Sequence, residues 1–261
     1  MRSHWTEYSI EALLLGLFMV SAGLVTTALE ATGSPLHGLL PSDFGRRALN
    51  GAAMGLTAMA LIYSPLGKRS GAHMNPAFTF SFLRLGKVAR GDAFAYMVAQ
   101  TAGGIAGVAL VAWLLGDAFR GAPVSWVVTH PGAGGESVAF AAELAISFGM
   151  MATALVCSNT PRLAPYTGLC CGFLLALYIT FEAPLSGMSI NPARSVASAA
   201  IPGVWRDIWI YLAAPPLGML LAAEAFRRAH GALRVHCAKL QHSDRYRCIF
   251  CGFEPHGEGA K

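Results

Sequence analysis

Six apolar segments, each close to 20 residues long, most restrict how this chain of 261 residues can fold. A helix needs about 20 apolar residues to cross the 30 Å hydrocarbon core of a bilayer. Only 13% of the residues are charged, whereas a soluble domain has about 25%, so most of the surface must face lipid. We therefore predict an all-α membrane protein with six transmembrane helices, at approximately residues 10–29, 48–66, 92–115, 138–157, 164–181 and 208–226.

Two further apolar segments are too short to span a bilayer. They cover residues 74–83 and 190–200; each follows a Ser-Gly pair and contains Asn-Pro near its start. Proline is favoured in the first turn of a helix, so we predict two half-helices entered from re-entrant loops. Non-helical backbone at membrane depth is tolerated only where protein buries it or where it lines a water-filled cavity. Two such loops therefore predict a cavity.

The chain also contains an internal repeat. The pattern Ser-Gly-x-x-x-Asn-Pro-Ala occurs once in each half, and Glu11 and Glu143 occupy equivalent helices. With three spans per half the two copies point in opposite directions, and inverted repeats place a binding site at the midplane where they meet. We divide the chain into a first half, a connecting loop, a second half and a Cys/His-rich tail, at residues 1–116, 117–137, 138–228 and 229–261.

The basic residues indicate the orientation. Most lie on one side of the six predicted spans, and the positive-inside rule then places both termini in the cytoplasm. The net charge of +5 could suggest a nucleic-acid partner, but these residues flank apolar segments, so we expect none. The side with more charges holds Lys68, Arg69, Arg84, Lys87, Arg90, Arg162, Arg227, Arg228, Arg234, Lys239, Arg245 and Arg247, and the other holds Arg46, Arg47, Arg120 and Arg206.

The two motifs, the Arg194-Ser195 pair after the second one and the paired glutamates resemble the major intrinsic protein family, the aquaporins and aquaglyceroporins. The resemblance covers residues 8–228. It implies a bacterial-type member in the inner membrane, and a homotetramer with one pore per subunit. It also implies a passive channel rather than an enzyme, with no cofactor for transport, which passes water or small uncharged solutes such as glycerol and excludes protons and ions.

The resemblance places the middle of the pore at Asn75-Pro76-Ala77 and Asn191-Pro192-Ala193. A helix N-terminus carries about half a positive charge, so two of them facing each other would oppose any cation. Each asparagine amide would donate to a passing oxygen. Free carbonyls would line the opposite wall, at Gly71, Ala72, His73, Ser186, Gly187 and Met188.

Arg194 is the candidate for an outer constriction, because an arginine at membrane depth is costly and marks a pathway. The family pattern adds Met54, Ile179 and Met188 to this selectivity filter. Strict water channels carry an aromatic residue and a histidine at the two helix positions, whereas glycerol facilitators usually carry aspartate where this chain has Ser195. We therefore expect passage of water together with small neutral solutes.

Several buried polar residues allow two interpretations. Glu11 and Glu143 could form a proton relay, but the resemblance favours carboxylates that accept backbone N–H groups and hold the re-entrant loops. His73 is interpreted as a residue of the loop and the pore wall. Gln100 is expected to pair with backbone in the core.

The tail contains Cys248-x-x-Cys251, with Cys237 and His242 nearby. This spacing is typical of zinc ligands, so the sequence predicts a zinc site at these four residues. The alternative is a disordered basic tail.

Three other classes of function remain as alternatives. The first is an inverted-repeat secondary transporter, which would need a coupling-ion site. The second is a membrane sensor that acts through a metal-binding tail. An intramembrane enzyme is the least favoured class, because the serines and histidines show no pairing of nucleophile and base.

Overall fold

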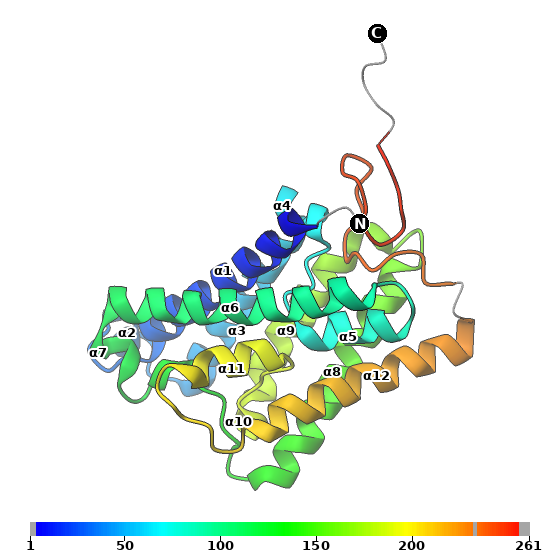
Figure 1. Cartoon of the computed structure of the whole chain (residues 1–261). Coiled ribbons are helices and arrows are strands. Elements are labelled where there is room, and N and C mark those ends of the chain that lie inside the picture. The colour runs from blue at the N-terminus through cyan, green and yellow to red at the C-terminus, as the bar shows by residue number, and fades with distance from the viewer. Residues whose placement is uncertain (1–3, 232–233, 256–261) are drawn as a thin grey trace.

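The computed structural model describes residues 4–231 and 234–255, and this part contains only helices and loops (Figure 1). Residues 1–3, 232–233 and 256–261, which belong to the predicted first half and tail, lie outside the described residues. The predicted long helices are present as α1 (Trp5–Glu30), α3 (Asp43–Tyr63), α6 (Arg90–Leu115), α8 (Gly135–Ser158), α9 (Thr167–Phe181) and α12 (Ile208–His230). The predicted half-helices are α5 (Pro76–Arg84) and α11 (Pro192–Ala200).

Short helices connect the long ones, and most of their residues lie outside the predicted spans. Several begin where a serine or proline favours a helix start: Ser64 caps one of them by accepting a hydrogen bond from the N–H of Gly67. These elements are α2 (Pro35–Leu39), α4 (Pro65–Ser70), α7 (Asp117–Arg120), η1 (Ser125–Val127), η2 (Ala164–Tyr166) and α10 (Ala183–Ser186).

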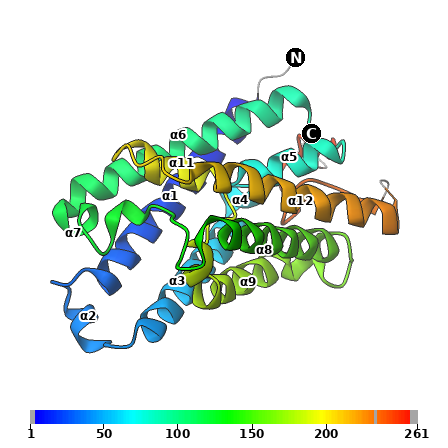
Figure 2. The same ribbon diagram turned by 90° about the horizontal axis from the view of Figure 1, so that it is seen from below.

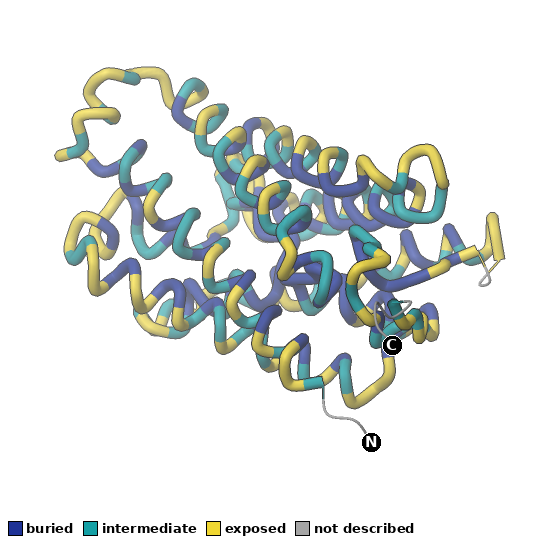
Figure 3. Tube along the Cα trace, turned by 90° about the horizontal axis from the view of Figure 1, so that it is seen from above, coloured by how far each residue is buried: buried dark blue, intermediate teal, exposed yellow. Residues whose placement is uncertain are grey.

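The surface of the bundle is suited to lipid. Helices α1, α6, α8 and α12, and α9 together with η2, are long and apolar enough to cross a membrane. Helix α3 has sufficient length at 21 residues, but its first turns carry charged side chains. Large apolar side chains point outward, among them Trp113 and Phe94, which are 77% and 69% exposed. Exposed positions lie along the outer faces of the helices (Figure 3). The chain is an integral, multi-pass membrane protein.

Glycines allow the long helices to approach one another closely. Helix α1 packs on α6, α12 on α8, and α3 on α9. A Cβ added at Gly103 would lie 1.9 Å from the carbonyl oxygen of Ala12, and one added at Gly218 would lie 2.3 Å from that of Leu144. Small residues of this kind are the usual means of close helix contact in membranes.

The half-helices connect the two halves of the molecule. Helix α5 packs on α12 of the second half, and α11 packs on α6 of the first (Figure 2). Both begin with proline after an asparagine cap: the Asn75 side chain accepts from the N–H of Ala77 at 2.8 Å, and Asn191 accepts from that of Ala193 at 3.0 Å. In both halves the re-entrant loop therefore leads into the capped N-terminus of its half-helix.

The tail folds back from the end of α12 onto the end of the bundle where the chain begins (Figure 1). The backbone N–H of His236 donates to the side chain of Asn159, in the loop after α8, at 2.8 Å. Cys248 is 1% exposed and Lys239 is 2% exposed. Residues 234–255 thus form a packed segment, in contrast to the alternative of a disordered tail.

Candidate functional site

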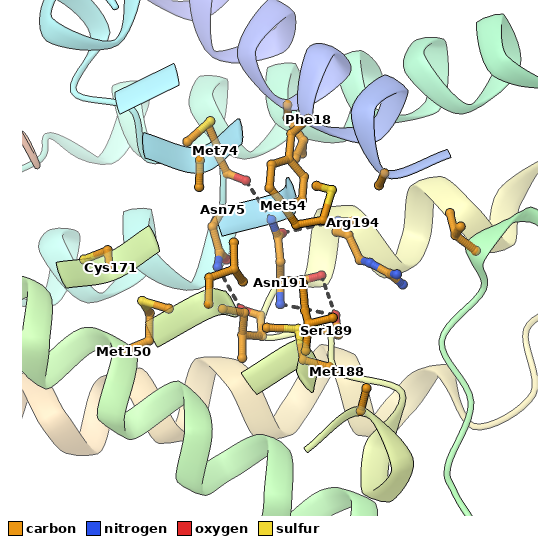
Figure 4. Close-up of a pocket in the computed structure, with 18 of the residues that line it drawn as sticks. Phe18, Met54, Met74, Asn75, Met150, Cys171, Met188, Ser189, Asn191 and Arg194 are labelled. Carbon is orange, nitrogen blue, oxygen red and sulfur yellow. Dashed lines mark hydrogen bonds between the residues drawn. The ribbon is translucent and has the colours of Figure 1, made fainter. Parts of the chain in front are cut away.

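The two asparagines of the repeated motif lie near each other in a pocket between the helices (Figure 4). The amide of Asn75 donates to the carbonyl of Ile190, and the amide of Asn191 donates to the carbonyl of Met74, both at 2.7 Å. Each asparagine therefore binds the re-entrant loop of the opposite half. An amide NH2 has two hydrogens, so each retains a second N–H in addition to the one used in this exchange.

The two re-entrant loops repeat an uncommon backbone conformation. Left-handed φ values occur at Ala72 (54°) and Met74 (48°), and again at Met188 (51°) and Ile190 (49°). Such values are rare outside glycine and persist only where surrounding contacts impose them. The repeated geometry therefore requires strong local support in each half.

Two buried carboxylates from the first helix of each half provide that support. Glu11 accepts from the backbone N–H groups of His73 (3.1 Å) and Met74 (2.7 Å). Glu143 accepts from those of Ser189 (2.5 Å) and Ile190 (2.8 Å). Each carboxylate also accepts from the serine that precedes its loop glycine. Both act here as acceptors for loop backbone.

Gln100 corrects one of our expectations. Its amide donates to the Glu11 carboxylate at 2.8 Å and to the Thr79 hydroxyl at 3.3 Å, rather than to backbone. Helix α6 passes beside Glu11 because glycines bring it against α1. The glutamine therefore adds a side-chain donor to the carboxylate that holds the first loop.

The sequence did not reveal the hydrogen bonds of a matched pair of tyrosines. Tyr96 donates to the carbonyl of Ser70 at 2.8 Å, and Tyr211 donates to the carbonyl of Ser186 at 2.6 Å. These residues follow Asn75 and Asn191 by 21 and 20 positions, so the internal repeat contained the signal. Because the Ser186 carbonyl accepts a hydrogen bond from Tyr211, our expectation that this carbonyl is free was wrong.

The half-helices carry a second pair, a hydroxyl one turn after each asparagine. Thr79 hydrogen-bonds the ring of His73 at 3.0 Å, and Ser195 hydrogen-bonds the hydroxyl of Ser189 at 2.6 Å. Thr129 of the connecting loop also bonds Ser195, at 2.8 Å. The hydroxyls fasten each half-helix to its own loop.

A cavity of about 310 Å³ runs between the helices and past both asparagines (Figure 4). Most of its wall is apolar, with Leu15, Phe18, Ile62, Phe78 and Leu175 as examples. The predicted residues that line it are Met54, Ala72, His73, Asn75, Ile179, Gly187, Met188, Asn191 and Arg194. The others, which do not line it, are Gly71, Pro76, Ala77, Ser186, Pro192, Ala193, Glu11 and Glu143.

Two buried polar atoms on the cavity-lining residues have no hydrogen-bond partner among the described residues. They are Nη1 of Arg194 and Oδ1 of Asn50. A buried polar group without a partner costs free energy unless something else bonds it. One donor and one acceptor thus remain for a molecule inside the cavity. Asn50 was missed, although an amide within an apolar span is itself a signal.

The tail packs on the first re-entrant loop. The backbone N–H of Leu240 donates to the carbonyl of Gly71 at 3.1 Å. The ring of His73 hydrogen-bonds the carbonyl of Ala238 at 2.7 Å. Our expectation of a free carbonyl at Gly71 was therefore wrong, because a segment far along the chain covers it. His73 lines the cavity and binds the tail as well as its own loop.

The tail also brings together the four predicted metal ligands. The ligand atoms of Cys237, His242, Cys248 and Cys251 all lie within 4.8 Å of one another. The Cys237 and Cys248 sulfurs are 3.4 Å apart, as are the Cys251 sulfur and Nε2 of His242. A tetrahedron with zinc–sulfur bonds of about 2.3 Å has edges of about 3.8 Å. The arrangement fits a tetrahedral metal site after small adjustments.

The surroundings of these ligands also suit a metal. Nδ1 of His242 lies 3.6 Å from a carboxylate oxygen of Asp244, the type of second partner that orients a metal-binding imidazole. A hydrogen bond from the Cys237 thiol lowers the pKa of the Cys248 thiol. Thiolates are the form of cysteine that binds metals.

Comparison with known proteins agrees with this geometry. The model of the Major intrinsic protein family matches residues 4–226. "Aquaporin NIP1-3" of Oryza sativa subsp. japonica is 36% identical over 66% of this chain and 58% of its own length. "Aquaporin NIP1-1" of Arabidopsis thaliana is 35% identical over 65% of this chain and 58% of its own length. The chain thus spans less than two thirds of these relatives.

A solved structure shares the fold. The aquaglyceroporin from Plasmodium falciparum superposes with a TM-score of 0.70 at 20% identity, over 89% of this chain and 99% of that one. The curated relatives above are plant proteins, so they do not support our expectation of a bacterial-type member in a bacterial inner membrane. Because the family model covers most of the chain, this protein belongs to the major intrinsic protein family.

Proposed function

We propose that the protein is a passive transmembrane channel for water and small uncharged solutes, and not an enzyme. The observation that carries this proposal is the pair of opposed half-helices whose asparagine side chains line one cavity between membrane-spanning helices. The names of the similar proteins, aquaporins and an aquaglyceroporin, support the same class. Water flux through proteoliposomes that contain metal-depleted protein tests the proposal: flux above that of empty liposomes is expected, and equal flux would contradict it.

The same geometry supports exclusion of protons and ions. The N-termini of α5 and α11 meet at Asn75 and Asn191, and each contributes about half a positive charge. A water molecule that accepts from the free N–H of both amides has its lone pairs occupied. It cannot then also accept a proton from the next water in the file. Cations meet an electrostatic barrier at the same point.

For the solutes, we infer a preference for molecules that combine apolar surface with a few hydroxyl or amide groups. Met54, Ile179 and Met188 give the proposed filter an apolar wall, while Arg194 and Asn50 offer one donor and one acceptor. Methionine is flexible and adapts to different shapes. Water, glycerol and urea fit this description, and comparison of their fluxes ranks them.

We further propose a homotetramer with both termini in the cytoplasm. The family resemblance supports the tetramer, and the excess of basic residues around α4, α5 and the tail supports the orientation. In that compartment the six cysteines, all free in the structure, stay reduced.

We also propose that the tail cluster binds one zinc ion. Purified protein is expected to contain about one zinc per chain, as four N and S ligands form a closed structural site. Cys248→Ser should lose most of this metal, whereas Cys170→Ser, which changes a cysteine in α9, should retain it. Elemental analysis by mass spectrometry measures the content. Equal zinc in both variants, or none in the wild type prepared under reducing conditions with zinc, would contradict the site.

A further inference from the structure

The two tail segments that carry the proposed metal ligands are the same segments that touch the channel. The first runs from Cys237 to His242 and the second from Cys248 to Cys251. Because each segment has a ligand at both ends, a bound metal would close each into a loop and tie the loops together. The residues enclosed in this way contact the first re-entrant segment.

The first loop is held on the re-entrant segment by three polar contacts. Ala238 accepts from the ring of His73, and the Leu240 N–H donates to Gly71. The ammonium of Lys239 donates to the carbonyl of Lys68, near the end of α4, at 3.0 Å. Lys239 is 2% exposed, which is uncommon for a lysine.

The second loop adds an aromatic contact. The ring of Phe250 stacks on His73, with centroids 5.4 Å apart and an interplanar angle of 10°, and meets Tyr96 edge-on at 5.8 Å. Gly71 packs closely against the Phe250 ring, because a Cβ added at Gly71 would lie 3.1 Å from that ring. Both metal loops therefore converge on the first re-entrant segment.

Leu240 lies at the point where this contact meets the pore. Its side chain lines the 310 Å³ cavity that passes the asparagines. It also lines a second cavity of about 380 Å³, formed by the tail and the loop between α8 and α9. Among the described residues, no other lines both cavities. Leu240 is 4% exposed and lies where the two cavities adjoin.

The charges are consistent with a metal at this place. Three thiolates and a neutral imidazole around a divalent ion sum to one negative charge. Lys239, two residues along the chain from Cys237, is buried and adds one positive charge to this segment. A buried charge is tolerated when it is paired.

We propose that a divalent metal ion of the zinc class, bound by Cys237, His242, Cys248 and Cys251, holds Leu240 in the tail-side mouth of the pore and keeps the pore closed. This inference rests on the proposed channel function. Without the metal, the two loops lose their common anchor, the tail leaves the first re-entrant segment, and the mouth opens. The tail would thus make permeability depend on metal supply.

The connecting loop between the two halves is an example of a segment that covers a re-entrant loop as a fixed part of the fold. On the opposite side of the bundle, Thr129 bonds Ser195, and the N–H of Gly132 donates to the carbonyl of Leu185 at 2.9 Å. That loop covers the second re-entrant segment as the tail covers the first. If the tail were a fixed cover of this kind, its removal would lower or not change permeability. Metal removal therefore distinguishes the two roles: permeability rises if the tail closes the pore, and falls or stays the same if the tail is a fixed cover.

The test uses full-length protein in liposomes, with water flux measured by stopped-flow light scattering. Four samples are compared: wild type loaded with ZnCl2, the same protein depleted of metal, Leu240→Ala loaded with zinc, and Cys251→Ser. If the metal keeps about nine pores in ten closed, flux in the last three rises about tenfold. Re-adding ZnCl2 should close the depleted wild type but not the two variants. Cys170→Ser and Leu36→Ala, whose residues lie outside the tail, are the controls and should behave as wild type.

Two results would overturn the proposal. The first is equal flux from zinc-loaded and metal-depleted wild type, with both above empty liposomes. The second is a rise in Cys251→Ser without one in Leu240→Ala, since Leu240 would then not close the pore. Flux no higher than that of empty liposomes in every sample would instead contradict the channel function itself. Elution of all variants at the same volume in size-exclusion chromatography shows that they are folded.

Discussion

Replacing Glu143 by alanine is expected to lower the free energy of unfolding by about 2–6 kcal/mol. The change removes the acceptor of two buried N–H groups, those of Ser189 and Ile190, and each buried donor left unsatisfied costs about 1–3 kcal/mol. These donors lie in a loop with left-handed φ values at Met188 and Ile190, so no regular backbone partner replaces the carboxylate. Unfolding of the detergent-solubilised protein, followed by circular dichroism, measures the loss.

Two further variants make this result specific. Glu143→Gln keeps one acceptor oxygen but sets an amide NH2 against a loop N–H, so its loss should be smaller than that of alanine. Glu136→Ala changes an exposed glutamate in the first turn of the same helix and should cost less than about 1 kcal/mol. Equal unfolding midpoints for Glu143→Ala and Glu136→Ala would show that the carboxylate does not hold the loop.

Arg194→Ala is expected to raise cation permeability by roughly 30-fold or more. A unit charge at 4–8 Å contributes a barrier of about 2–4 kcal/mol at an effective dielectric constant near 20, and about 1.4 kcal/mol corresponds to a factor of ten. Nη1 of Arg194 is buried without a partner among the described residues, and the residue lines the cavity. Among the described residues, no carboxylate lies within ion-pair distance of Arg194.

The measurement is dissipation of a sodium or proton gradient in proteoliposomes, with the change made in Leu240→Ala chains so that the mouth is open. Arg194→Lys is the matched control, because it keeps the charge and loses the planar fork of donors. It should still exclude cations while its flux of glycerol or urea changes. If Arg194→Ala and its parent leak cations equally, Arg194 does not form the constriction.

The sequence was sufficient for the main elements of the fold. Apolar length identified the long helices, and the Asn-Pro pairs identified α5 and α11 to within two residues of their starts. Boundaries were less accurate where a polar cap begins a helix early: Ser42 accepts from Gly45 and starts α3 at Asp43, several residues before its apolar stretch. Local side-chain capping, rather than hydropathy, sets such a boundary.

Side-chain partners were harder to predict because they depend on how helices approach one another. Gln100 was assigned a backbone partner, yet glycine-mediated contact between α1 and α6 places it on Glu11. The tail is the larger case: Ala238 bonds His73 across 165 positions, and no local pattern indicates where a Cys/His cluster will dock. The spacing of the cysteines predicted a metal site, but only the fold relates that site to the pore.

The most direct test of the channel function is stopped-flow water flux in proteoliposomes containing metal-depleted wild-type protein, compared with empty liposomes of the same lipid. We predict osmotic shrinkage clearly faster than in empty liposomes, with glycerol and urea entering as well and protons excluded. Equal rates for empty and protein-containing liposomes, for every solute and also in Leu240→Ala, would contradict the account.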